Sequence, residues 1–178
     1  MAVWFVCFGL YNAVCSIRNR YTDEDLYKDV KAMNRPLRRS SIIAVTDGDG
    51  SNRYLLYHDA NWGCDFFPNR AATGDVEADM ANAARYLTVE FGIPESDVEL
   101  KPVGMAESTK YSTEHHEQRD YVYQLYRASL RAVPDGWRGD RFSVRGKDCR
   151  WMTLDEMLAD GRINEINHDV VALVRQSA

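Results

Sequence analysis

A loop and a helix near the middle of the chain constrain the fold more than any other segment. Residues 67–93 begin with turn-forming residues and continue into an amphipathic helix. Its apolar residues recur at three- and four-residue spacing, which places them on one helical face: Met80, Ala83, Ala84, Leu87 and Phe91. Thr73 or Asp75 can cap the start of this helix, and Gly92 followed by Pro94 ends it. The sequence therefore predicts one sharply bounded helix after a structured loop.

This segment resembles the Nudix box, whose pattern is G-x5-E-x7-R-E-U-x-E-E-x-G-U, where U is a bulky aliphatic residue. The matching residues, together with the upstream glutamate, are Glu77, Arg85, Leu87, Glu90, Gly92 and Ile93. Alternatively, Gly74-Asp75 represents the Gly-Glu turn of the family, with two extra residues before the arginine. Tyr86 and Val89 replace the other two glutamates of the R-E-U-x-E-E run, and Pro68-Asn69-Arg70 stands where the family usually has Pro-Gly-Gly.

The missing glutamates bear directly on metal binding. A Nudix enzyme holds Mg2+ or Mn2+ with carboxylates from adjacent turns of one helix, and the ions polarise a pyrophosphate and help to generate the attacking hydroxide. Glu77 and Glu90 lie roughly 20 Å apart along a helix axis, so they cannot share one ion. We therefore predict a domain that keeps the Nudix fold but has no catalytic residues, no metal and no cofactor. Its residual box residues are Glu77, Arg85 and Glu90, and we expect Arg85 to brace the box through a salt bridge.

Two alternatives to this interpretation remain. The first is an active diphosphohydrolase that binds Mg2+ through displaced ligands, above all Glu77 and Glu90, with Asp79 and Glu114 as further candidates. The second is an ordinary core helix with Glu90 on its solvated side.

The N-terminal segment, residues 1–20, is predicted to be hydrophobic. Residues 2–15 are almost wholly apolar, and the first basic residues, Arg18 and Arg20, follow directly. Because a bilayer span needs about 20 residues, this is either a short or truncated membrane helix or a helix that packs on the domain or on a partner. The basic flank favours the cytoplasmic side of an inner membrane. Four cysteines without metal-ligand spacing also suit a reducing cytoplasm.

Residues 21–38 are predicted to form a linker helix. Thr22 and Asp25 have the spacing of a capping box, and the apolar stripe that follows is Leu26, Tyr27, Val30 and Met33. Such a helix is too short to be stable alone in water. It is expected to pack on the domain, to space the domain from a membrane, or to pair with a second copy.

Residues 39–178 show the mixed pattern of an α/β domain. Residues 42–45 and 53–58 predict a hairpin, residues 98–105 and 110–112 two further strands, and residues 120–130 the clearest strand. Thr153 and Glu156 mark the start of a helix, and a last helix lies near residues 164–174. The predicted fold is a Nudix-like α/β/α sandwich with a mixed sheet, preceded by the hydrophobic segment and the linker helix.

The whole layout resembles a narrower family, the SMODS-associated, membrane-tethered Nudix proteins of bacterial cyclic-oligonucleotide antiphage (CBASS) systems. In that family the Nudix domain is thought to sense a cyclic nucleotide, and the membrane part damages the inner membrane. The resemblance implies a nucleotide second messenger as ligand and a membrane as partner. The family usually has two membrane helices, of which this chain would hold only the tail of the second.

A nucleotide sensor needs cations for phosphates and aromatic rings for bases. Arg70 is the first candidate, since it lies in the loop where the family's phosphates bind; it can equally be a solvated loop residue. Tyr123 shares a strand face with Tyr121 and Leu125, so it stacks on a base or belongs to the core.

A polar loop supplies the remaining ligand candidates, His115 and Arg119, which could meet a phosphate over the cleft. His115 and His116 cannot easily chelate one ion, because adjacent side chains point apart. The basic, aromatic stretch 137–147 is either a phosphate clamp or a soluble hairpin. Because the net charge is −5, the chain has no overall positive field, and we expect no nucleic-acid polymer as partner.

Three function classes remain open: a ligand-sensing module tied to a membrane or a homo-oligomer, a working hydrolase, and a scaffold without a nucleotide pocket. The first is the prediction that we carry forward.

Overall fold

The computed structural model describes residues 22–48, 52–112 and 116–177. The chain divides into two compact units, residues 1–36 and 37–178. The hydrophobic segment predicted for residues 1–20 lies outside the described residues. Within the described ranges, no helix combines the length and the hydropathy that a membrane span requires.

The first unit contains one described helix, α2 (Asp23–Met33). The Thr22 hydroxyl accepts a hydrogen bond from the Asp25 backbone N–H at 3.2 Å, and the Asp25 carboxylate accepts one from the Thr22 backbone N–H at 2.9 Å. The predicted capping box is therefore confirmed. None of the residues of α2 is buried, and its apolar stripe is exposed throughout.

The second unit is built on one mixed sheet. Its strands are β1 (Leu37–Thr46), β2 (Arg53–Asp59), β3 (Cys64–Phe66), β4 (Asn69–Ala71), β5 (Val98–Ser112), β6 (Glu117–Leu130), β7 (Arg141–Val144) and β8 (Lys147–Thr153). The strand order is β5-β6-β1-β2-β8-β7, with β3 paired to β2 and β4 paired to β1. Strands β1 and β6 are parallel, and the other described pairs are antiparallel.

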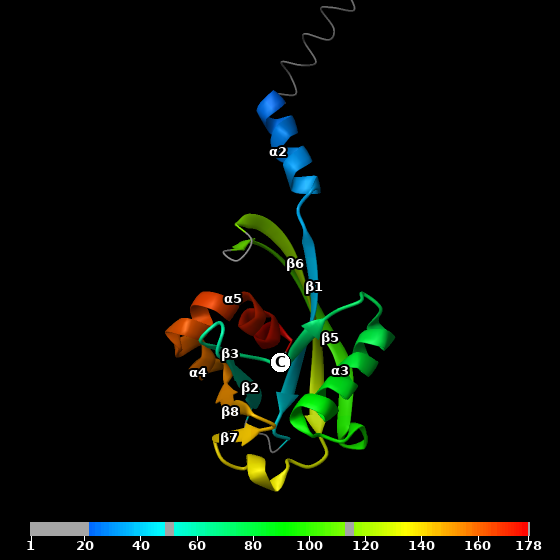
Figure 1. Cartoon of the computed structure of the whole chain (residues 1–178), viewed down its shortest axis with the longest axis vertical. Helices are drawn as coiled ribbons and strands as arrows, with labels where there is room; N and C mark the ends of the chain where they lie inside the picture. Colours follow the sequence, from blue (N-terminus) through cyan, green and yellow to red (C-terminus); the bar gives the residue numbers. More distant parts are fainter. Residues whose placement is uncertain (1–21, 49–51, 113–115, 178) are drawn as a thin grey trace, which may run out of the picture. The chain divides into compact units, whose positions relative to one another are not determined.

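Helices cover both faces of this sheet (Figure 1). Helix α3 (Val76–Phe91) packs on one face, while α4 (Leu154–Ala159) and α5 (Gly161–Gln176) pack on the other. Two short 3-10 helices, η1 (Glu95–Asp97) and η2 (Asp135–Trp137), lie in the connections. The predicted α/β/α sandwich with a mixed sheet is confirmed.

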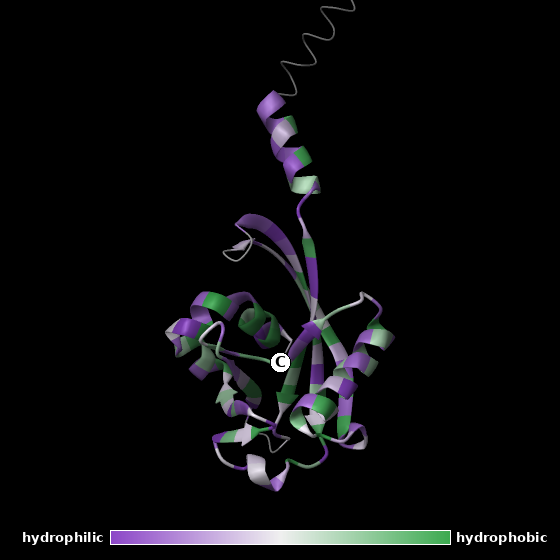
Figure 2. Ribbon diagram, in the orientation of Figure 1, coloured by the Kyte–Doolittle hydropathy of each residue, from purple (hydrophilic) through white to green (hydrophobic). Residues whose placement is uncertain are grey.

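The alternation of side chains along β1 explains why the domain has a core on each side of the sheet. Ile43 and Val45 pack with the α3 residues, whereas Ile42 and Ala44 pack with α5. All four are at most 5% exposed, so β1 is buried on both faces as a central strand should be. Figure 2 shows hydrophobic colour on the later part of β1, after a more hydrophilic start, and mixed colours on the helices.

Two strand predictions need correction. The predicted hairpin of β1 and β2 is in antiparallel register at Thr46 and Tyr54, but the strands then part, and β4 and β3 pair with them. Residues 98–112 form one strand rather than two, with a register shift between Pro102 and Gly104. Proline cannot donate to a ladder, so the shift absorbs the irregularity without ending the strand.

Candidate functional site

The loop before α3 is fixed by a buried carboxylate. Asp79 is 2% exposed, and its oxygens accept hydrogen bonds from the Thr73 backbone N–H at 2.7 Å, the Thr73 hydroxyl at 2.8 Å and the Gly74 backbone N–H at 3.1 Å. Asp75, not Thr73, caps the helix, by accepting from the Ala78 N–H at 2.9 Å. In the alternative interpretation Asp79 is a candidate metal ligand; in this structure its oxygens accept hydrogen bonds from the loop instead.

Helix α3 ends at Gly92, as predicted. Gly92 adopts a left-handed conformation with φ of 72°, and its N–H donates to the Thr88 carbonyl at 3.0 Å. No basic residue lies in the last turn of the helix itself. Arg145, in the turn between β7 and β8, supplies one by donating from its guanidinium to the Val89 carbonyl. A cation from another part of the chain thus complements the negative end of the helix dipole.

Beside this helix end lies a group that we call the box cluster: Tyr57, Arg70, Tyr86, Glu90 and Lys147. The guanidinium of Arg70 lies 5.1 Å from the centre of the Tyr86 ring, which is a cation–π contact. Tyr86 is only 8% exposed. It stands at a position that is glutamate in the Nudix box pattern. Arg70 itself is exposed, so its unshared donors face solvent above the aromatic ring.

The second cation of the cluster is Lys147, at the start of β8. Its ammonium lies 3.0 Å from a Glu90 carboxylate oxygen and 5.6 Å from the centre of the Tyr57 ring. The side chains of Lys147 and Glu90 are 27% and 35% exposed, so solvent still reaches the pair. Glu90, the remaining glutamate of the box, therefore holds a protein cation.

The two tyrosines of the cluster are neutral at physiological pH. Burial raises the pKa of Tyr86, and the nearby Tyr57 and Glu90 raise it further. Burial also raises the pKa of Tyr57, whose hydroxyl accepts from the Asn69 amide at 3.3 Å. Both phenols therefore retain their protons, and the charges of the cluster are those of Arg70, Lys147 and Glu90.

The residues of the cluster do not suit a divalent cation. Such an ion needs several oxygen ligands, and among residues 22–48, 52–112 and 116–177 no group of three or more His, Cys, Asp or Glu side chains could hold one. Glu77 is exposed in the first turn of α3, while Glu90 lies in the last. The ammonium of Lys147 also pairs with the Glu90 carboxylate, which would otherwise be available to a metal ion.

The predicted ligand residues do not come together in one place. Arg70 belongs to the α3 face, because it pairs with Ser41 and lies over Tyr86. Tyr123 lies on the opposite face with the α5 residues, where the Lys110 ammonium is 5.7 Å from its ring centre. Arg119 binds Glu117 at 2.7 Å near the end of the β5–β6 hairpin. His115 and Glu114 lie outside the described residues.

The salt bridge expected of Arg85 is not found among the described residues. Arg85 is exposed, and within the described part of the chain it forms no ion pair. The helical spacing explains this: its neighbours Tyr86 and Leu87 turn toward the sheet, which leaves Arg85 on the outer face. The described residues therefore give no support to a bracing role for Arg85.

Tyr57 and Lys147 were not among the predicted site residues. Tyr57 lies within the predicted strand 53–58, and Lys147 ends the basic stretch 137–147. That stretch is a hairpin of β7 and β8, with Arg145 and Gly146 at positive φ in its turn. A tight turn at Arg145-Gly146 fixes which strand residues share a face. Recognising this turn in the sequence would have predicted the face of the sheet on which Lys147 lies.

A separate cavity lies on the face of β8 opposite to the box cluster. Its volume is about 630 Å³, and residues from β2, β3, β7, β8 and the start of α5 line it. Asp65 is central to its wall, since it contacts the His58 imidazole at 2.7 Å and the Arg150 guanidinium. Burial raises the pKa of the lining thiols, Cys64 and Cys149, to about 11, so neither is a thiolate nucleophile at neutral pH.

Solved structures similar to this chain are Nudix proteins. The Ap4A hydrolase of C. elegans has a TM-score of 0.52 and 13% identity, over 79% of this chain and 95% of that chain. A MutT protein from Methanosarcina mazei Go1 has a TM-score of 0.52 and 16% identity, over 78% and 93%. The Nudix domain of Shewanella oneidensis NrtR, solved with ADP ribose, has a TM-score of 0.50 and 13% identity, over 80% and 87%.

Sequence comparison adds no relative, because neither a protein-family model nor a curated protein matches the chain. Identities this low show the fold alone. The domain therefore has a Nudix hydrolase fold, as the box resemblance predicted.

Proposed function

We propose that this domain binds a nucleotide through its phosphates and does not hydrolyse it. The observation that supports this most is the box cluster, where two cations and two aromatic rings surround Glu90, and where Tyr86 stands at one of the positions that are glutamate in the Nudix box. With Arg70 and Lys147 against Glu90, the formal charge is 2 − 1 = +1, so the cluster attracts an anion and repels a metal ion.

Phosphate recognition in this proposal is direct. The exposed guanidinium of Arg70 donates to phosphate oxygens in a fork, and the Lys147 ammonium has donors beyond the one that Glu90 accepts. Tyr57 and Tyr86 supply neutral, partly buried rings beneath these cations. Hydrolysis by the Nudix route needs a metal-activated water, for which the described residues assemble no ligand set.

We extend the proposal to the ligand class: a cyclic oligonucleotide signal, read by a module coupled to a membrane segment. The support is the layout of the sequence, with a hydrophobic segment and a capped linker helix before the Nudix-fold domain. A nucleotidyltransferase gene beside this one would favour that assignment. Its absence from the neighbourhood in every genome that carries the gene would overturn the assignment without touching the binding proposal.

The test is a thermal-shift panel of cyclic di- and trinucleotides, ADP-ribose and Ap4A, measured in EDTA and again in Mg2+ or Mn2+. Binding raises the melting temperature by mass action, and we expect the shift to survive EDTA. Chromatography of the same mixtures should show no product. Metal-dependent turnover of any nucleotide would contradict the proposal and favour an active diphosphohydrolase instead.

Substitutions in the box cluster test whether the nucleotide binds there. Arg70→Ala and Lys147→Gln should each weaken binding by about 1–3 kcal/mol in calorimetry, since each removes a charge-assisted contact. The matched control is Arg131→Gln, an exposed arginine in the connection after β6. Equal loss in the control would mean that the effect is general electrostatics, and an undiminished affinity in Arg70→Ala would remove that residue from the site.

A further inference from the structure

The cavity on the α4–α5 side contains two arginines in unfavourable places. The first is Arg141 on β7, whose direct cross-strand partner on β8 is Arg150. Like charges directly opposite each other on an antiparallel pair destabilise that pair. Arg141 also lies on an edge strand, where solvent-facing positions accept many other side chains.

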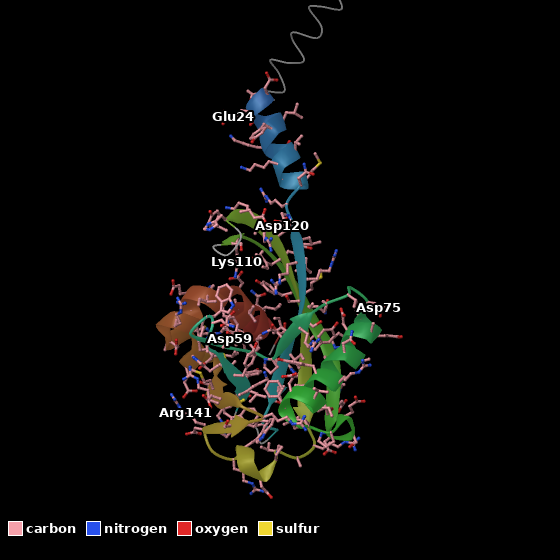
Figure 3. All side chains as sticks on the ribbon, in the orientation of Figure 1. Glu24, Asp59, Asp75, Lys110, Asp120 and Arg141 are labelled. Atoms are coloured by element: carbon pink, nitrogen blue, oxygen red, sulfur yellow. The ribbon has the colours of Figure 1, made fainter. Side chains whose placement is uncertain are left out.

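Arg150 does not share its ion-pair partners with Arg141. Its guanidinium contacts the Asp65 carboxylate and lies 3.3 Å from Asp160. Arg141, by contrast, is exposed and forms no ion pair within the described part of the chain. Figure 3 labels Arg141 on β7, far from Asp75 at the start of α3. Carboxylates therefore balance the charge of Arg150, whereas within the described part of the chain none is paired with Arg141.

The second arginine is Arg162, in the first turn of α5. A cation there opposes the helix dipole, and that turn contains no acidic residue. Arg162 is held in place by the Trp62 carbonyl at 2.9 Å and by Glu165 at 2.8 Å, with its side chain 49% exposed. The helix N-terminus is satisfied separately, because Asp160 accepts from the backbone N–H groups of Arg162 and Ile163 at 3.0 Å.

Two residues that break local electrostatic rules thus line one cavity. Such violations are expected at functional or strained sites, and an anionic ligand between the two arginines would offset both of these. The acids around them are mostly committed: Asp65 binds His58 and Arg150, and Asp160 caps α5. Asp148 remains, exposed on the same strand face as Arg150, and it would accept hydrogen bonds from hydroxyl groups.

We propose that this cavity is a second site, which binds a small phosphate monoester with hydroxyl groups, the phosphate lying between Arg141 and Arg162. The volume of about 630 Å³ suits a molecule of that size. The site holds its ligand non-covalently. It is separate from the box cluster, since Asp148 and Arg150 project from the face of β8 opposite to Lys147.

The experiment uses the full chain with inorganic phosphate and ribose 5-phosphate as probes, followed by calorimetry and thermal shift. We expect Arg141→Gln and Arg162→Gln each to weaken ribose 5-phosphate binding roughly tenfold or more. Arg131→Gln is the matched control and should bind normally. Arg70→Ala and Lys147→Gln should also leave this binding unchanged, which separates the cavity from the box cluster.

A stability measurement supplies an independent test. Without ligand, Arg141→Thr should melt at a higher temperature than the natural chain, because it removes the cross-strand repulsion and places a β-branched residue on a strand. With ribose 5-phosphate, the same variant should lose the ligand-induced shift. Binding that survives the double variant Arg141→Gln/Arg162→Gln, or an Arg141→Thr variant less stable than the natural chain in the absence of ligand, would overturn the proposal.

Discussion

The two ends of helix α3 differ in what their carboxylates contact. At the start, Asp79 is buried and accepts hydrogen bonds from the loop that precedes the helix. At the end, Glu90 is about one-third exposed and pairs with the ammonium of Lys147. The first carboxylate holds the shape of the loop and helix; the second holds a cation that belongs to another strand.

This difference shows that the loop and helix are held in shape without any contribution from the Glu90 carboxylate at the far end. The loop and helix depend on backbone hydrogen bonds, a left-handed glycine and apolar burial, and none of these requires a metal ligand. Tyr86 and Val89, by contrast, carry no carboxylate, and our proposal of a domain that does not hydrolyse its ligand rests in part on these two side chains.

The largest expected effect comes from removing the buried carboxylate of Asp79 at the start of α3. Asp79→Ala removes the acceptor of three hydrogen bonds and leaves N–H groups of Thr73 and Gly74 without it. We expect the free energy of unfolding to fall by about 3 kcal/mol, measured by urea denaturation. The control Asp75→Ala removes only the N-cap and should cost about 1 kcal/mol. An Asp79 variant no less stable than the Asp75 variant would show that the buried carboxylate does not hold the loop.

A smaller effect is expected at the end of the helix. Gly92→Ala places a side chain at φ of 72°, which costs about 1 kcal/mol for a residue with a Cβ. The new methyl group would also approach the Arg145 guanidinium at 3.4 Å. Gly136→Ala is the control, because its added Cβ meets nothing within 4 Å. If both variants unfold at the same urea concentration, the left-handed cap contributes nothing measurable.

The sequence predicted the parts of this domain that local interactions decide. The helix limits at Asp75 and Gly92 follow from capping chemistry within a few residues, as do the capping boxes at Thr22 and Thr153. The alternation of faces along β6 was also predictable, and the stacked rings of Tyr121 and Tyr123 confirm it. These features require no knowledge of distant parts of the chain.

Contacts between distant segments were not predictable in this way. Lys147 reaches Glu90 only because the tight turn at Arg145-Gly146 brings the β7–β8 hairpin against the end of α3. The separation of Arg70 from Tyr123 arises because β1 is buried on both faces, so residues on its neighbours can lie on either side. Asp79 had a local signal, since it lies four residues before Ala83 on the apolar stripe, where only a hydrogen-bonded carboxylate can be buried.

The smallest effect on stability is expected at Glu90, the partly exposed carboxylate at the end of α3. The same variant distinguishes a nucleotide-binding domain from a metal-dependent hydrolase. Glu90→Gln keeps the shape of the side chain and removes its charge. Because the pair with Lys147 is partly solvated, we expect the free energy of unfolding to change by less than about 1 kcal/mol. Nucleotide affinity should stay nearly intact or increase, since the substitution frees the Lys147 ammonium for a phosphate. Catalysis that depended on a metal at Glu90 would instead be abolished. A Mg2+-dependent activity present in the natural chain and lost in Glu90→Gln would therefore show that this carboxylate binds a metal ion rather than a lysine during function.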